Sequence, residues 1–385
     1  MGEFNESRYI MSCVIKSVGR LILALGVVVP LAPSFAQEPE AGVLTPPEQV
    51  IPTALPEEDV YQNPPESGKV ASPLDVTDEL GHSAHVFPQM GAATQPVTAT
   101  DRGPLLYHGG PIMRKVTLFT IYWLPSKLPN GQPATMVSGY QTILNNVAAD
   151  YMGHDLSSIT TEYYQTASGT ATYISGLPSE VTSTGSLGGT YVDTDPYPAS
   201  ICSMPAYPGN CLDDAQLQAE LLKVLKLKGW TAGLDRMYLV FTAKGLGSCM
   251  DAGGKSCNTP GTGYCAYHGH TTLNGTPVVY GNMPYAYPAG CSGTSSSPNN
   301  NVDADTESTA VTHEVSEAIT DPEASAWYTA KGNEIGDLCA YNYGTNTYDS
   351  GQANQFWNGH YYEVQREFDN HLYALTLSGC SQVGP

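Results

Sequence analysis

Residues 306–322, TESTAVTHEVSEAITDP, carry the clearest alternation of apolar and polar positions in the chain. With a helical period of 3.6 residues, the apolar positions fall on one side and the polar positions on the other. The apolar side comprises Val311, Val315, Ala318 and Ile319, and the polar side comprises His313, Glu314, Glu317 and Asp321. The pattern predicts an amphipathic helix with a core-facing stripe and a face that carries one imidazole and three carboxylates.

The remaining chain mixes strand-like and helix-like stretches. A β-branched and aromatic run predicts a buried strand at 116–123, helical spacing predicts helices at 136–151 and 213–228, and short apolar runs predict strands at 237–242, 264–268 and 278–283. This order predicts an α+β fold, a mixed β-sheet with packed helices, closed by an irregular, disulfide-tied C-terminal region. Zinc peptidases of the zincin type also place a mixed sheet before the helix with the His-Glu pair, so we expect a zincin-like arrangement.

The first 102 residues differ in composition from the rest. Lys16 and Arg20 precede an apolar run at 21–32 and a small-residue cleavage pattern at 34–36, which predicts a signal peptide over 1–36. The Pro-rich stretch 37–102 predicts a disordered linker or pro-segment, and 103–385 is expected to form the α+β domain. No later stretch is apolar for 18 residues, so we expect an exported protein without a membrane span, secreted or extracellular, with periplasm or cell wall as alternatives.

Eight cysteines follow the predicted signal peptide, at positions 202, 211, 249, 257, 265, 291, 339 and 380. An even number in an exported chain favours disulfides over metal thiolates. Proximity along the chain suggests that 202 pairs with 211 and 339 with 380. The pairing of the four cysteines between 249 and 291 stays open.

His313 and Glu317 lie four residues apart, so both can reach one ion from the same helix face. The metalloprotease motif His-Glu-x-x-His uses this geometry, with its Glu as general base. Here Glu317 replaces the second His, so we expect His313 and Glu317 as ligands and Glu314 as the catalytic base. A further ligand is expected from Asp321, Glu334 or Asp337. Zinc is the expected ion, and the added carboxylate makes manganese or calcium the alternatives.

Charge along the sequence favours this interpretation. No Lys or Arg occurs between Lys255 and Lys331, so the acidic residues of this segment have no cationic neighbour in sequence. A divalent cation would supply the missing charge, and water would do so if the face were exposed. The stretch 301–307 alternates oxygen ligands like a calcium loop, but it lacks the EF-hand glycine, and capping of the following helix is the preferred interpretation.

Composition excludes several functions. The net charge is −21 with only 16 Lys and Arg, which argues against nucleic acid as a partner. The chain has no Gly-x-Ser-x-Gly elbow and no phosphate-binding glycine loop. The expected partner is a peptide or a cell-wall polymer, and the sequence indicates no oligomeric state.

The motifs at 313–322, 326–328 and 333–339, HEVSEAITDP, AWY and NEIGDLC, resemble the phosphate-induced protein family that includes the plant EXORDIUM proteins. The stretches 107–111, 122–123 and 265–269 are similar too, and the likeness covers roughly 103–380, as in a bacterial-type exported member. In that family Glu at position 317 belongs to the pattern. The resemblance implies an exported or cell-wall protein associated with growth and specifies no reaction.

Two classes of function therefore follow from the sequence. The first is an exported metal-dependent hydrolase, in the first instance a peptidase. The alternative is a non-catalytic extracellular or cell-wall binding protein, whose carboxylates hold a structural ion or none and whose tyrosine-rich surface recognises a polymer. A glycosidase with paired carboxylates is a third possibility, which requires two carboxyl groups about 5 to 9 Å apart across a cleft.

Overall fold

A seven-stranded mixed sheet forms the middle of the fold in the computed structural model, which describes residues 74–77, 81, 83–90, 103–167, 170–173, 187–200, 202–254, 256–286, 288–292 and 296–384. Its strands, in spatial order, are β1 (Asp75–Thr77), β2 (Ser83–Pro88), β11 (Tyr264–Leu273), β12 (Thr276–Met283), β9 (Arg236–Thr242), β4 (Thr117–Trp123) and β7 (Leu187–Asp193). Neighbours from β1 to β12 run antiparallel, and those from β12 to β7 run parallel. The predicted mixed sheet is confirmed.

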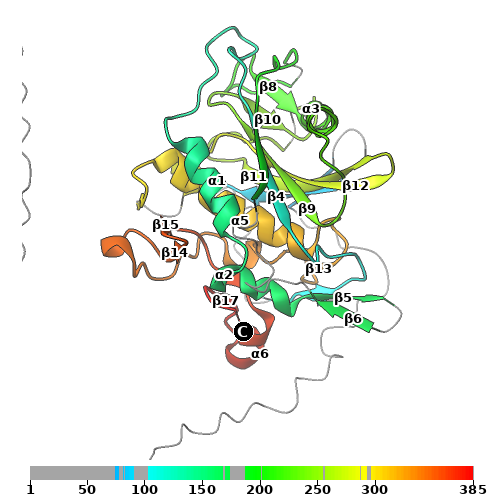
Figure 1. Cartoon of the computed structure of the whole chain (residues 1–385), viewed down its shortest axis with the longest axis vertical. Coiled ribbons are helices and arrows are strands. Elements are labelled where there is room, and N and C mark those ends of the chain that lie inside the picture. The colour runs from blue at the N-terminus through cyan, green and yellow to red at the C-terminus, as the bar shows by residue number, and fades with distance from the viewer. Residues whose placement is uncertain are drawn as a thin grey trace, which may run out of the picture. The chain divides into compact units, whose positions relative to one another are not determined.

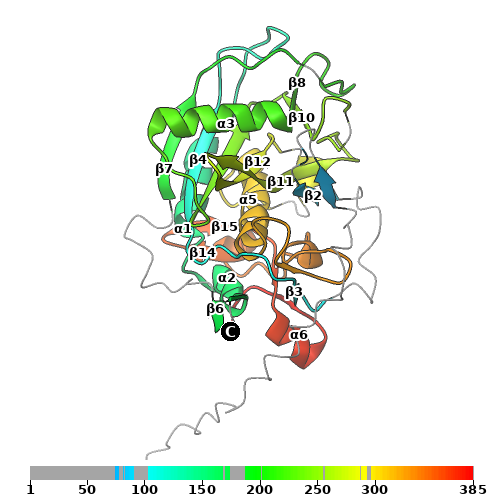
Figure 2. The ribbon, with the colours of Figure 1, turned by 90° about the vertical axis from the view of Figure 1, so that its right-hand side faces the viewer.

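Helices cover both faces of this sheet (Figures 1 and 2). α1 (Tyr140–Asp150) and α5 (Val302–Thr320) pack on the face formed by Leu118, Leu239 and their neighbours. α3 (Asp214–Lys228) packs on the opposite face, against Ile121, Val240 and their neighbours. Alternate residues of one strand therefore enter different cores, as the two-residue period of a strand requires. The predicted helices at 136–151 and 213–228 and the predicted strands at 264–268 and 278–283 are confirmed.

Short elements complete the described part of the chain. The small strand pairs are β3 (Leu106–Tyr107) with β13 (Trp327–Tyr328), β5 (Tyr164–Ala167) with β6 (Thr170–Tyr173), β8 (Cys211–Asp213) with β10 (Gly247–Cys249), β14 (Gln355–Trp357) with β15 (His360–Tyr362), and β16 (Glu367–Phe368) with β17 (Cys380–Ser381). The short helices are α2 (Asp155–Ser158), η2 (Ile159–Glu162), α4 (Pro288–Cys291), η4 (Asp337–Cys339), η5 (Asp349–Gly351) and α6 (Asn370–Thr376). The C-terminal region is irregular, as predicted.

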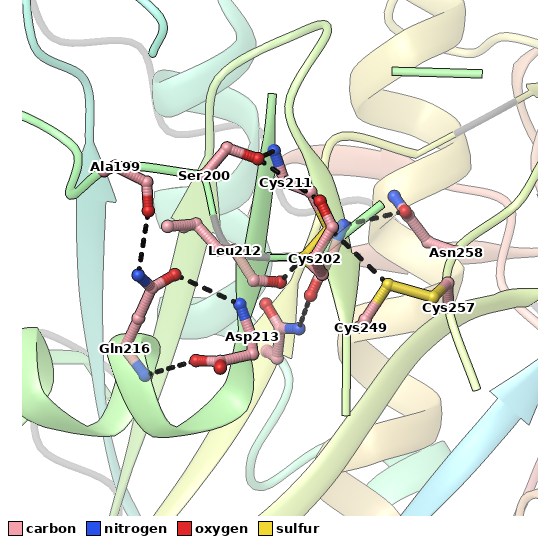
Figure 3. Close-up of a disulfide and its surroundings, with 12 residues drawn as sticks. Ala199, Ser200, Cys202, Cys211, Leu212, Asp213, Gln216, Cys249, Cys257 and Asn258 are labelled. Atoms are coloured by element: carbon pink, nitrogen blue, oxygen red, sulfur yellow. Dashed lines mark hydrogen bonds between the residues drawn. A yellow bond between two sulfur atoms is a disulfide. The ribbon is translucent and has the colours of Figure 1, made fainter. Parts of the chain in front are cut away.

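Local sequence sets the limits of α3. Asp213 accepts a hydrogen bond from the backbone N–H of Gln216, whose side chain reaches back to the Asp213 N–H (Figure 3). This reciprocal capping satisfies two N–H groups that lack a helical partner. Gly229 ends the helix in the left-handed conformation at φ 67°, which glycine adopts without steric cost.

α5 is buried from Ala304 to Thr320, which is all of the helix after its first two residues. The sequence predicted burial only for its apolar stripe. The polar stripe is covered as well, because β2, β11 and the segment 334–339 pack onto that side of the helix. α5 is thus a core helix with charged groups inside the protein.

The stretch Asp75–Pro88 belongs to the sheet, whereas the sequence analysis placed it in a disordered linker. β2 pairs with β11, and its Phe87 is fully buried in the main core. β2 has only six residues and lies between prolines. Its strand-like pattern is therefore a small part of the 66-residue stretch 37–102, whose overall composition is that of a disordered linker. The predicted signal peptide and most of the Pro-rich stretch lie outside the described residues. Within the described part, no helix is long and apolar enough to cross a bilayer.

Four disulfides tie the described residues together: Cys202–Cys211, Cys249–Cys257, Cys265–Cys291 and Cys339–Cys380. The first and last confirm the two predicted pairs. Figure 3 shows two of them close together beside β8 and β10. Cys339–Cys380 joins η4 to β17, so it anchors the segment that carries Glu334 and Asp337.

The position of β2 predicts the effect of shortening the chain. A chain that begins at residue 73 should keep its thermal unfolding temperature. One that begins at residue 103 should unfold at a much lower temperature, because β11 loses its pairing with β2 and the core loses the buried Phe87 side chain. Loss of such a side chain costs about 3 to 5 kcal/mol. Thermal unfolding followed by circular dichroism tests this. Equal unfolding temperatures for both chains would show that β1 and β2 do not stabilise the domain.

The disulfides should differ in their effect on stability. The Cys339–Cys380 bond spans 41 positions and the Cys202–Cys211 bond spans 9. Loop-closure entropy then predicts a loss of about 4 kcal/mol for Cys339→Ala with Cys380→Ala, and about 3 kcal/mol for Cys202→Ala with Cys211→Ala. Urea unfolding of the two double variants measures these losses. An unchanged midpoint for either variant would contradict the assigned bond.

Candidate metal centre

Three buried histidines meet on the side of the sheet that α5 covers. His85 on β2 and His268 on β11 are direct cross-strand partners, so their side chains project from the same face. The ring of His313 on α5 stacks on Phe87 of β2, with centroids 4.0 Å apart. Register in the sheet and packing of one helix therefore bring together imidazoles that are far apart in sequence.

Carboxylates surround these histidines. Glu314 and Glu317 come from α5, and Glu334 and Asp337 come from the segment that leads into η4. All four are buried. Within the described part of the chain, no Lys or Arg forms an ion pair with any of them, whereas the histidines lie close to all four. The sequence has no Lys or Arg between positions 255 and 331, and in the described part of the fold no Lys or Arg pairs with these four carboxylates either.

The two ring nitrogens of His268 have different neighbours. Its Nε2 lies 3.3 Å from the backbone carbonyl oxygen of Asp321, and its Nδ1 lies 3.2 Å from Oε2 of Glu314 and 3.6 Å from Oε2 of Glu317. A carbonyl oxygen only accepts hydrogen bonds, so it favours the tautomer with the proton on Nε2. Nδ1 then points a lone pair toward two carboxylates, which is the orientation of a metal-binding histidine held by a backbone carbonyl.

His313 and Glu317 lie close without a hydrogen bond. The His313 Nε2 is 3.0 Å from Oε1 of Glu317, but neither nitrogen of His313 and neither oxygen of Glu317 has a hydrogen-bond partner. Gly336 lies against the other side of the imidazole, where a Cβ atom would approach Nδ1 to 2.6 Å. Glycine at this position lets the chain of the 334–339 segment cover the histidine.

His85 lies among three carboxylates. Its Nε2 is 2.7 Å from Oδ2 of Asp337, and its Nδ1 is 3.0 Å from Oδ1 of Asp75 and 3.3 Å from Oε1 of Glu334. Both oxygens of Glu334 lack a hydrogen-bond partner. Its Oε2 lies 3.7 Å from Nε2 of His268, so Glu334 spans the distance between the two strand histidines.

The electrostatics follow from this crowding. Burial lowers the pKa of His313, but the carboxylates of Glu317, Glu314 and Asp337 outweigh it and raise the pKa to about 10. Burial raises the pKa of Glu334 well above its ordinary range, although His85 opposes the shift. Positive charge is therefore favoured strongly at this place, whether from protons or from cations.

Three sets of side chains each place ligand atoms within 4.8 Å of one another: Asp75 with His85 and Glu334, His85 with Glu317 and Asp337, and His268 with Glu314 and Glu317. The last two share Glu317. We call the seven residues His85, His268, His313, Glu314, Glu317, Glu334 and Asp337 the α5 centre. The donor set, imidazole nitrogen and carboxylate oxygen, is one that Zn²⁺ and Mn²⁺ accept.

The sequence-predicted residues fall into two groups. His313, Glu314, Glu317, Glu334 and Asp337 come together in the centre. Asp321 caps the end of α5, where its Oδ1 accepts the backbone N–H of Ala326, and it belongs to none of the three sets. Its side chain orders the turn after the helix.

Sequence reasoning missed His85 and gave His268 no role. Each lies in an alternating apolar run, SAHVFP and YCAYHG, and a histidine in such a run faces one side of a sheet. The calcium-like stretch 301–307 has protein partners instead: Lys244 pairs with Asp303 at 2.9 Å, and Asn301 caps α5 by accepting from the N–H of Ala304.

Glu307 is the control within the same helix. It is buried like Glu317, but its Oε2 accepts hydrogen bonds from the Tyr140 hydroxyl and from the Ala286 N–H. Burial raises its pKa to about 8. It lies outside the α5 centre. A substitution of Glu307 therefore tests the effect of burying a carboxylate in α5 without changing a residue of the centre.

This raised pKa predicts a pH dependence of stability. The folded pKa of about 8 exceeds the ordinary value of 4.5, so the stabilisation linked to the proton on Glu307 is complete below pH 4.5 and is lost as pH rises through 8. Glu307→Gln should remove this loss. The unfolding temperature of the variant minus that of the wild type should increase from pH 5 to pH 9, and a constant difference would contradict the shifted pKa.

No protein-family model, curated protein or solved structure matches this chain. The likeness to EXORDIUM proteins therefore stays an expectation from the sequence. The function has to be argued from the chemistry of the α5 centre itself.

Proposed function

We propose that this chain is an exported metal-dependent hydrolase whose α5 centre binds a divalent cation. The observation that carries the proposal is the set of fully buried ligand atoms without a hydrogen-bond partner: both nitrogens of His313, both oxygens of Glu317 and both oxygens of Glu334. Each unsatisfied buried polar group costs about 1 to 3 kcal/mol, and a charged one costs more. A bound cation would remove this cost for several groups at once.

His313 and Glu317 hold the cation in this proposal, and Asp337 and His85 complete its shell. The His313 Nε2 lies 3.0 Å from Glu317 Oε1 and 3.9 Å from Asp337 Oδ1. A cation at this place would lower the pKa of a bound water and polarise a carbonyl group. Zinc suits the imidazoles, while the carboxylates extend the choice to manganese or calcium.

Glu314 is the proton acceptor in this proposal. It follows His313 directly in α5, its Oε1 has no hydrogen-bond partner, and its Oε2 faces His268. The mixed sheet with the His-Glu helix packed on one face supports the proposal of a zincin-like arrangement, and with it a peptide bond as the substrate. Export is supported by the predicted signal peptide and by the four disulfides.

Complete burial favours a second function, a non-catalytic extracellular binding protein with a structural cation. Glu314, Glu317 and His313 have no exposed surface, so a peptide cannot reach them in this arrangement of β2, β11 and the segment 334–339. The β14–β15 hairpin presents the exposed rings of Phe356 and Tyr361, whose centroids lie 4.8 Å apart with the ring planes tilted by 36°. Exposed aromatic rings of this kind suit contact with a cell-wall polymer.

Metal content and hydrolysis of a casein substrate, measured on the same oxidised protein, test the proposal. His313→Ala should lose the ion that His313 holds, and the activity with it. Glu314→Gln should keep at least one ion per chain and lose about 10²- to 10⁴-fold in rate, the usual contribution of a general base. Glu307→Gln, a buried carboxylate of the same helix outside the centre, should keep both.

The outcomes separate the two functions. A wild-type protein that binds no Zn²⁺, Mn²⁺ or Ca²⁺ at neutral pH contradicts the hydrolase and the structural cation, and it leaves a binding protein that holds no ion. If the wild type binds metal but does not cleave casein, and chelation only lowers its unfolding temperature, the cation is structural and the second function stands. Cleavage by Glu314→Gln at the wild-type rate removes Glu314 from the reaction.

A further inference from the structure

The α5 centre contains more ligands and more charge than one ion requires. Three imidazoles and four carboxylates are fully or almost fully buried there, whereas a structural or catalytic zinc takes about four ligands. The carboxylates of Glu314, Glu317, Glu334 and Asp337 pair with no Lys or Arg of the described residues. When metal binding has removed the protons from all four carboxyl groups and from the histidines, one divalent cation would leave two of these negative charges uncompensated. Two cations would balance all four when the histidines are neutral.

Glu317 lies between two histidines. Its Oε1 is 3.0 Å from Nε2 of His313, and its Oε2 is 3.6 Å from Nδ1 of His268. Neither oxygen has a hydrogen-bond partner, although the side chain is completely buried. A carboxylate whose two oxygens face different imidazoles has the geometry of a bridge between two ions.

Each side of this bridge has its own ligand set. On one side, His268 and Glu314 place ligand atoms within 4.8 Å of Glu317, and on the other side His85 and Asp337 do so, with His313 alongside. The two sets share no residue other than Glu317. Two-metal hydrolytic sites hold their ions about 3.5 to 4 Å apart, a distance that one bridging carboxylate spans.

We propose that the α5 centre binds two divalent cations bridged by the carboxylate of Glu317. The first ion is the one of the proposed function, so this inference rests on that function. The second ion is bound by Nδ1 of His268, whose tautomer the Asp321 carbonyl fixes, and by Oε2 of Glu314. Oε1 of Glu314 stays available as proton acceptor. Glu334, which lies between His85 and His268, is placed to contact either ion.

Mn²⁺ binding to the metal-free wild-type protein tests the number of ions directly. Titration followed by equilibrium dialysis and elemental analysis should saturate at two Mn²⁺ per chain. Electron paramagnetic resonance at saturation should show the loss of the isolated six-line Mn²⁺ signal, because two ions bridged by one carboxylate couple magnetically. Neither measurement needs a variant, so misfolding of a variant does not affect the result.

Variants then assign the two positions. His268→Ala and Asp337→Asn should each reduce saturation from two ions to one and restore the isolated Mn²⁺ signal. Glu317→Gln should weaken the binding of both ions by at least tenfold. Glu307→Gln, the matched buried glutamate of α5, should bind two coupled ions like the wild type. Circular dichroism spectra equal to that of the wild type show that the variants are folded.

The possible failures are distinct. Saturation at one Mn²⁺ per chain with an isolated signal overturns the two-ion inference and leaves the proposed function intact. Two ions without magnetic coupling overturn the bridge by Glu317. Absence of any bound ion contradicts the proposed function and this inference together.

Discussion

The burial of the polar side of α5 is the constraint on which the rest of the structure depends. A helix with carboxylates on one side normally turns that side to water, but here β2, β11 and the segment 334–339 cover it. Two like charges 4 Å apart repel by about 4 kcal/mol at an effective dielectric constant near 20. Four carboxylates in one enclosed volume therefore destabilise the fold unless positive charge enters with them. Histidines supply part of that charge, and the cation that we propose would supply the remainder.

The elements around the α5 centre hold its imidazoles and carboxylates in fixed positions. The histidines come from a cross-strand pair and a helix, which are rigid elements, while two of the carboxylates come from a loop that a disulfide anchors. Gly336 allows this loop to touch the imidazole of His313, and the carbonyl of Asp321 orients His268. Each contact limits the rotation of one ligand, so the ligand atoms are held close together before anything binds.

The sequence predicted those parts of the candidate site whose residues lie close together along the chain. The His313–Glu317 pair was visible because the spacing of four residues is a local property of a helix. His85 and His268 were not assigned to the site. The two histidines are 183 positions apart and become neighbours only through the register of β2 and β11, and β2 lies in a Pro-rich stretch that does not look like a strand. The disulfides do not divide by range. The pair 339–380, separated by 41 positions, was predicted, whereas the pairs 249–257 and 265–291, separated by 8 and 26, stayed open because four cysteines share that stretch and spacing does not choose among their pairings.

The bond between Cys339 and Cys380 has a consequence for how the protein matures. It fixes the η4 segment next to Glu334 and Asp337, so this part of the centre is held in place only after the two thiols have been oxidised. A thiol-reducing compartment would leave the segment untethered during synthesis. The centre would then be completed where disulfides form, so if it binds the metal that we propose, the ions of that compartment would be the ones available to it.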